Sequence, residues 1–142
     1  MAKFSMENLE ALFDDLAAII ELPDEIALEM LTAGAEVLAE AQAAEAATML
    51  AGEFSQGITA KSFVVDKKLS GKGGERCVYI KPDGTRTDGN KRRIAEVAFI
   101  NEYGKTGQAA RPFIRTANER KGEAAVDAAA QVYDKYLKSK NL

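Results

Sequence analysis

The stretch Ala98-Phe-Ile-Asn-Glu-Tyr-Gly-Lys-Thr-Gly-Gln-Ala-Ala-Arg-Pro-Phe-Ile-Arg-Thr-Ala117 joins an apolar run, two glycines and a stiff Arg-Pro-Phe segment. The apolar run begins at Ile94 and ends at Tyr103, and its side chains alternate between the two faces of an extended chain. Because β-branched and aromatic residues are frequent in it, we predict a strand over residues 94–103. A helix is the rival interpretation, since residues 94, 97, 98 and 101 also share one helical face.

The residues after this run predict a turn and a rigid approach to the last helix. Gly104 and Gly107 permit the positive φ angles that a turn can require. Pro112 fixes its own φ and biases Arg111 toward extended geometry, so that Phe113 leaves a stiff backbone. Two interpretations of Phe113 stay open. It is either an anchor at a protein interface, where stiffness lowers the cost of ordering, or a core residue, with Glu102 and Arg111 as a solvated pair.

The first half of the chain has helical patterns. Apolar residues recur at helical spacing over residues 9–20, and Pro23-Asp24 suits the start of a second, alanine-rich helix that extends to about Leu50. Residues 51–57 end this helix.

From Gly57 onward the apolar pattern has a period of two. Residues 62–66 and 76–80 are predicted strands of a hairpin, with a glycine-rich turn between them. The polar, basic segment 82–93 is expected to be a mobile surface loop. The last helix is expected to begin near Thr116 or Ala117 and to bury the following residues: Ala125, Ala128, Ala129, Val132, Tyr133, Tyr136 and Leu137.

These patterns predict a single α+β domain over residues 1–142. Its parts are an acidic helical part (1–56), a β-rich basic part (57–115) and a C-terminal helix (116–142). We expect N-terminal helices, a small, mainly antiparallel β-sheet and the C-terminal helix packed on that sheet.

Charge is distributed unevenly between the two halves. Residues 1–56 contain twelve Asp or Glu and one Lys, a net charge of −11, whereas residues 57–142 contain eighteen Lys or Arg and ten acids, a net charge of +8. Two arrangements explain this asymmetry. The acidic helices pack on the basic part of the same molecule, or the acidic part of one subunit meets the basic part of the next.

The composition gives no support to an enzyme, a cofactor or a metal site. The chain has no histidine, which removes the commonest general base and the commonest metal ligand, and one cysteine cannot build a thiolate zinc site. We expect Cys77 to be a small buried thiol in a strand. No secretory signal or membrane-spanning run is evident, so synthesis in the cytoplasm is expected.

A basic cluster supports a different function class. Lys91, Arg92 and Arg93, with Lys81 and Arg86 nearby in the sequence, are candidates for contact with DNA phosphates from a loop over residues 81–93. The alternative function is therefore a DNA-binding accessory protein, although the whole chain is acidic and has no recognised base-stacking motif.

The order Phe99-Ile-Asn-Glu-Tyr-Gly104, a short polar loop, Ala110-Arg-Pro-Phe-Ile-Arg115 and then Ala117 resembles the signature of a family of small tail-component proteins of long-tailed bacteriophages. These are tail-completion or head-tail joining proteins. The resemblance is sharp over residues 94–118 and elsewhere rests on the order of elements.

The resemblance implies a structural virion protein of the neck, made in the cytoplasm of the host bacterium and present in a phage or prophage particle. Such proteins form rings, commonly six-fold, that cap the tail tube and join it to the filled head. The implied partners are copies of the chain, the tail-tube protein, and head-completion or connector proteins, with passing contact to DNA and none with membranes. The implied assembly interface comprises Glu102, Tyr103, Gly104, Arg111, Pro112, Phe113 and Arg115.

Overall fold

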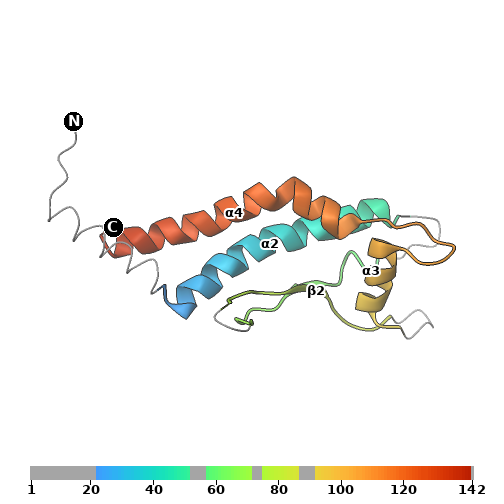
Figure 1. The fold of residues 1–142 in the computed structure, drawn as a ribbon, viewed down its shortest axis with the longest axis horizontal. Coiled ribbons are helices and arrows are strands. Elements are labelled where there is room, and N and C mark those ends of the chain that lie inside the picture. The colour runs from blue at the N-terminus through green and yellow to red at the C-terminus, as the bar shows by residue number, and fades with distance from the viewer. Residues whose placement is uncertain (1–21, 52–56, 72–74, 87–91, 142) are drawn as a thin grey trace.

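The computed structural model describes residues 22–51, 57–71, 75–86 and 92–141. The elements along the chain are α2 (Asp24–Met49), β1 (Phe63–Val65), β2 (Ile80–Pro82), α3 (Ile94–Tyr103) and α4 (Phe113–Ser139) (Figure 1). The predicted α+β class is confirmed. The helix predicted over residues 9–20 lies outside the described residues.

Two long helices, α2 and α4, lie side by side and run in opposite directions (Figure 1). Their interface is built mainly from small side chains, which let the two backbones approach closely. A Cβ atom added at Gly34 of α2 would lie 3.1 Å from the Ala125 carbonyl oxygen of α4. The predicted bounds of α2 are confirmed to within one residue. Its first turn contains the acidic residues Asp24 and Glu25, whose negative charges interact favourably with the positive end of the helix dipole.

Polar pairs join the two long helices at defined positions. The Gln42 Nε2 atom donates a hydrogen bond of 2.8 Å to Asn118 Oδ1, and Gln42 is buried. Glu45 forms an ion pair with Arg120 one turn further along. An unpaired buried amide would cost free energy, so the Gln42–Asn118 pair favours one register of α2 against α4.

The predicted hairpin is confirmed, and its second strand is displaced along the chain. β1 and β2 pair antiparallel, with Phe63 opposite Pro82 and Val65 opposite Ile80, whereas residues 76–80 were the predicted strand. Ser70 and Cys77 form an isolated bridge farther from the ladder. β1 packs on α2, so α2 lies between α4 and the hairpin (Figure 1).

The core lies where the end of α2, β1, α3 and the start of α4 meet. Phe113 is fully buried there against Ala46 and Ala98, and its ring meets the ring of Phe63 edge to face, with centroids 6.0 Å apart. The half-buried residues around this cluster are Met49, Leu50, Ala60, Phe63 and Ile114. α4 therefore meets the sheet through Phe113 and packs on α2 along most of its length.

The strand predicted over residues 94–103 is wrong, because these residues form the helix α3. The rival helical interpretation is correct, and three of the residues that it places on one helical face, Ile94, Ala98 and Asn101, are buried. Side-chain contacts made by the helical form override the strand propensity of the β-branched and aromatic residues.

The last helix begins at Phe113, three residues earlier than Thr116. Pro112 precedes its first residue, a place where the missing N–H of proline costs nothing. Ala125 is buried on the predicted face, and Val132, Tyr133, Tyr136 and Leu137 are half-buried. Within the described ranges, no helix has the length and apolar content needed to cross a bilayer.

Candidate assembly interface

Helix α3 presents two different faces. Its inner face buries Ile94, Ala98, Asn101 and Glu102, whereas Phe99 and Tyr103 on the outer face are 62% and 71% exposed. Residues 99 and 103 are one turn apart, and their rings stack at a tilt with centroids 4.8 Å apart. The outer face thus carries a paired aromatic surface open to solvent.

Glu102 holds the start of α4 from within the same chain. Its carboxylate accepts the backbone N–H of Ile114 at 2.8 Å and that of Arg115 at 3.0 Å. The first turn of α4 contains no acidic residue, so Glu102 supplies the negative charge that the helix N-terminus favours. Because Glu102 is only 8% exposed, the predicted solvated pair with Arg111 is wrong.

Asn101 connects α3 to the segment that follows it. Its side-chain amide donates to the Val97 carbonyl, and its Oδ1 atom accepts from Gln108 at 3.3 Å and from the Arg111 guanidinium at 2.7 Å. The Asn101 carbonyl also accepts the Arg111 N–H. Sequence reasoning missed this role of Asn101. The feature that could have indicated it is a polar amide at position 101 on the same helical face as the apolar residues 94, 97 and 98.

Gly104 is required by the backbone. Its φ of 79° lies in the left-handed region, and an added Cβ atom would lie 2.9 Å from both the Gln108 carbonyl oxygen and the Ala110 nitrogen. Gly104 therefore ends α3 and permits the Lys105–Gln108 turn. Its role within the chain is local folding.

The interpretation of Phe113 as an interface anchor is wrong, and the core interpretation is confirmed. Its side chain has no exposed surface and lies within the hydrophobic cluster of its own chain. Pro112 places this residue at the start of α4 and beside Phe63. The stiffness of the Arg-Pro-Phe segment thus serves internal packing.

Of the seven predicted interface residues, three have exposed side chains on the same part of the molecule: Tyr103, Arg111 and Arg115. Arg115 lies 3.7 Å from Glu119 in an exposed pair along α4. Sequence reasoning omitted Phe99 from this surface. Its position four residues before Tyr103 places it on the same helical face, but only once the segment is known to be a helix.

The candidate DNA-contact residues are only partly described. Arg92 and Arg93 are exposed, and Lys91 lies outside the described residues. The flanks of the 81–93 segment are tied to the fold, because the Arg86 N–H bonds to the Arg92 carbonyl and the Ile94 N–H bonds to the Gly84 carbonyl. The DNA-binding hypothesis stays a prediction.

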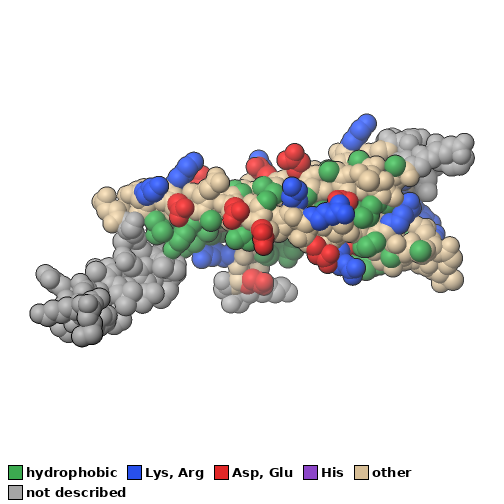
Figure 2. All heavy atoms as spheres, turned by 90° about the horizontal axis from the view of Figure 1, so that it is seen from above, with side chains coloured by type: hydrophobic (Ala, Val, Ile, Leu, Met, Phe, Trp, Pro, Cys, Tyr) green, Lys and Arg blue, Asp and Glu red, His purple; other side chains and the backbone are tan. Residues whose placement is uncertain are grey.

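Both signs of charge meet within the molecule. Acids of α2 pair with basic residues of the second half: Glu36 with Lys67 at 3.6 Å, Asp24 with Arg76 at 3.4 Å, and Glu45 with Arg120. In the view onto α4, acidic and basic side chains are interspersed along the helix pair (Figure 2). The intramolecular arrangement therefore exists, while Glu25 and Glu29 have no ion-pair partner among the described residues.

Cys77 is half-buried, and its Sγ atom lies 3.2 Å from the Ser70 carbonyl oxygen, which accepts its hydrogen bond. Over the ranges that the structure describes, no group of three or more Cys, Asp or Glu side chains is placed to hold a metal ion.

The chain was compared with protein-family models, with curated protein sequences and with solved structures, and none of them matches it.

Proposed function

We propose that the chain is a structural virion protein of a phage or prophage, a tail-completion or neck component that caps the tail tube and joins it to the head. The observation that carries the proposal is the exposed Phe99–Tyr103 pair, which lies in the segment that resembles the phage tail-component family. Large aromatic side chains that remain exposed together are typical of surfaces that bind another protein.

The aromatic pair is also held in a fixed position. Asn101 and Glu102 tie the intervening turn of α3 to the following segment and to α4. A side chain that is already ordered before binding costs less free energy to immobilise at an interface. The buried face of α3 therefore supports the contact that its exposed face makes.

In this proposal the protein acts as a ring of copies, six-fold in the particle, between the tail-tube protein and the head-completion or connector proteins. The exposed Arg92 and Arg93 permit non-specific contact with the DNA that passes through such a ring. The chain performs no chemical reaction in this role.

Deletion of the gene from the phage or prophage that carries it tests the proposal. We expect filled heads and separate tails to accumulate in electron micrographs, and the infectious titre to fall by several orders of magnitude. The wild-type gene supplied in trans should restore joined particles. Joined, infectious particles after deletion would refute the proposal.

A DNA-binding measurement distinguishes the alternative. If the protein is a DNA-binding accessory factor, the purified chain shifts duplex DNA in a salt-dependent way and the double variant R92E/R93E abolishes the shift. The neck proposal predicts that R92E/R93E leaves head-tail joining intact.

A further inference from the structure

A hollow lies at the opposite end of the helix pair from α3. It has a volume of about 490 Å³, and we name it the α2 groove because most of its lining comes from α2. The lining residues are Glu25, Leu28, Glu29, Thr32, Ala33 and Glu36, with Val132 of α4 and Lys67. Leu28, Ala33 and Val132 are half-buried and we call them the apolar floor, whereas Glu25, Glu29 and Glu36 are exposed and we call them the rim.

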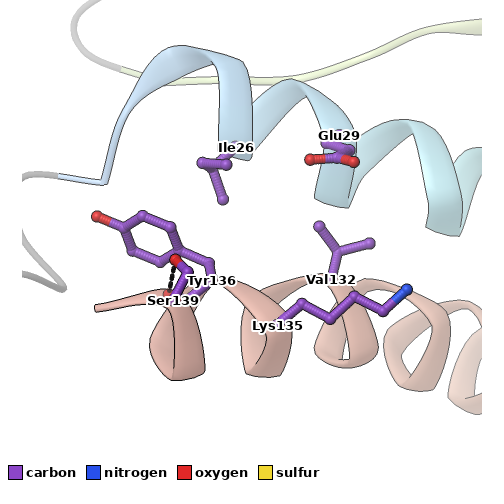
Figure 3. A pocket seen from close by; sticks show the side chains of 6 residues that line it. All are labelled: Ile26, Glu29, Val132, Lys135, Tyr136 and Ser139. Carbon is purple, nitrogen blue, oxygen red and sulfur yellow. Dashed lines mark hydrogen bonds between the residues drawn. The ribbon is translucent and has the colours of Figure 1, made fainter. Parts of the chain in front are cut away.

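Glu29 and Val132 also line a neighbouring hollow of about 240 Å³ between the two helices. Figure 3 shows Ile26 and Val132 pointing into this space from opposite helices, with the Tyr136 ring beside them and Lys135 along α4. The apolar floor therefore continues toward the start of α2.

The rim of the α2 groove is acidic. Helix α2 contains six acids and no basic residue. Lys67 also borders the groove, but it pairs with Glu36. Glu25 and Glu29 are exposed and have no ion-pair partner among the described residues. A surface that complements this groove has an apolar centre and positive surroundings.

The α3 end of the molecule has that composition. We name this surface the α3 face: the exposed Phe99–Tyr103 pair, with the exposed Lys105 and Arg111 in the segment that follows the helix. Glu96 is the acidic residue exposed on the same helix. Since Phe99 and Tyr103 are 62% and 71% exposed, covering them buries about 200–330 Å², which is a substantial part of one partner's share of a standard interface.

We propose that the α3 face of one copy docks in the α2 groove of a second copy. The contact joins unlike surfaces at opposite ends of the molecule, so it repeats head to tail and closes into a ring where the rotation permits. The inference rests on the proposed function, because it names the subunit contact of the proposed ring.

A second copy fits the α2 groove better than the N-terminal segment of the same chain. Residues 1–21 contain five acids and one lysine, so their charge has the same sign as the groove rim. Like charges at a contact are unfavourable, whereas the cations around Phe99 and Tyr103 are attracted to Glu25 and Glu29.

Two double variants of the full-length protein test the contact by native mass spectrometry and sedimentation. F99A/Y103A removes the aromatic pair, and E25K/E29K reverses the charge of the groove. Each is expected to weaken self-association by about 30-fold or more. F99A/Y103A removes central aromatic anchors, which dominate interface energies, and E25K/E29K places like charges against the cations of the α3 face. The matched control is Tyr79→Ala, which removes an aromatic that is 57% exposed on the hairpin and should leave self-association unchanged.

Mixing the two variants gives the sharpest result. Each retains the surface that the other lacks, so the mixture should form a 1:1 dimer and no larger species. Wild-type protein that stays monomeric, or a mixture that forms no dimer, would overturn the proposal. Association that E25K/E29K leaves unchanged, together with a rise in monomer thermal stability, would place the chain's own acidic N-terminal segment in the groove and would also overturn it.

The inference and the proposed function fail separately. Head-to-tail association by these surfaces, together with normal particles after gene deletion, refutes the neck function alone. Unjoined particles after gene deletion, together with association that neither double variant affects, refutes the docking contact alone.

Discussion

The side chain of Phe113 fills the space between α2, α3 and β1, and we expect its truncation to destabilise the isolated protein. Phe113→Ala should lower the free energy of unfolding by about 3–5 kcal/mol, because it leaves a cavity in a buried cluster. Urea denaturation of the monomer measures this loss. Tyr103→Ala, at a site that is 71% exposed, is the control and should change stability by at most about 0.5 kcal/mol. Equal stability of the two variants would contradict the core role of Phe113.

Glu102 is the second residue on which the fold depends. Glu102→Gln removes the negative charge and leaves one acceptor oxygen for the two N–H groups of Ile114 and Arg115. We expect a loss of about 1–3 kcal/mol in unfolding free energy and faster hydrogen exchange at those two amides. Glu119→Gln is the matched control, since Glu119 is exposed and forms a weak surface pair with Arg115. Unchanged exchange at Ile114 and Arg115 would contradict the capping role.

The sequence points to the right segment, residues 94–118, but does not determine the role of each residue in it. Residue type alone left Phe113 either at a surface or in the core, because an aromatic beside proline and arginine suits both. The buried position follows from long-range packing against Ala46 and Phe63, which no local pattern contains. The capping contact of Glu102 spans twelve residues and required the helical form of α3 to be known.

At the scale of the elements, the two helical glycines have opposite roles. Gly34 lies where α2 and α4 approach closely, whereas a Cβ atom at Gly122 of α4 would meet no atom within 4 Å. Gly122→Ala should raise the unfolding free energy by about 0.5–1 kcal/mol through helix propensity. Gly34→Leu should lower it by about 1–3 kcal/mol, because the larger side chain forces the helices apart.

Thermal and urea unfolding of both glycine variants test this pair of expectations. A Gly34→Leu protein that is as stable as wild type would show that the two helices do not need their close approach. A destabilising Gly122→Ala would contradict the open position of that residue on α4.

The elements differ in how well the sequence predicts them. The alanine-rich periodicity of α2 and the period-two pattern of the hairpin are local signals, and both were found. The aromatic and β-branched content of α3 predicts a strand. The hydrogen bonds of Asn101 with Val97 and Arg111 favour the helix instead, and they are tertiary or depend on helical geometry. α4 begins earlier than predicted because the Glu102 carboxylate accepts the N–H groups of Ile114 and Arg115, a contact that no local pattern predicts.

At the scale of the whole molecule, the proposed contact depends on charge as well as on aromatic surface. We expect self-association to weaken as ionic strength rises from about 0.05 M to 0.5 M, since salt screens exposed charges. In the E25K/E29K protein the residual association should depend less on salt or should strengthen with it. Sedimentation at several salt concentrations measures both trends, and association that is independent of salt in the wild type would contradict the electrostatic part of the contact.

The charge asymmetry of the sequence was informative about the whole molecule, but it did not assign the partner of each charge. Glu36, Asp24 and Glu45 pair inside the chain, and Glu25 and Glu29 do not pair with described residues. Only the three-dimensional arrangement distinguishes the acids that form ion pairs from those that do not, because all five lie on the same helix and the sequence alone does not tell them apart. The α+β class needed no such information.

The length of the helix pair has a geometric consequence for the assembly. α2 contains 26 residues and α4 contains 27, and helices of these lengths span about 39–41 Å. Since the two proposed contact surfaces lie at opposite ends of this pair, the distance between neighbouring contacts is set by the number of helical turns. The circumference of a closed ring is then the subunit number multiplied by that distance. A paired insertion or deletion of whole turns in α2 and α4 would change the bore of the ring without altering either contact surface.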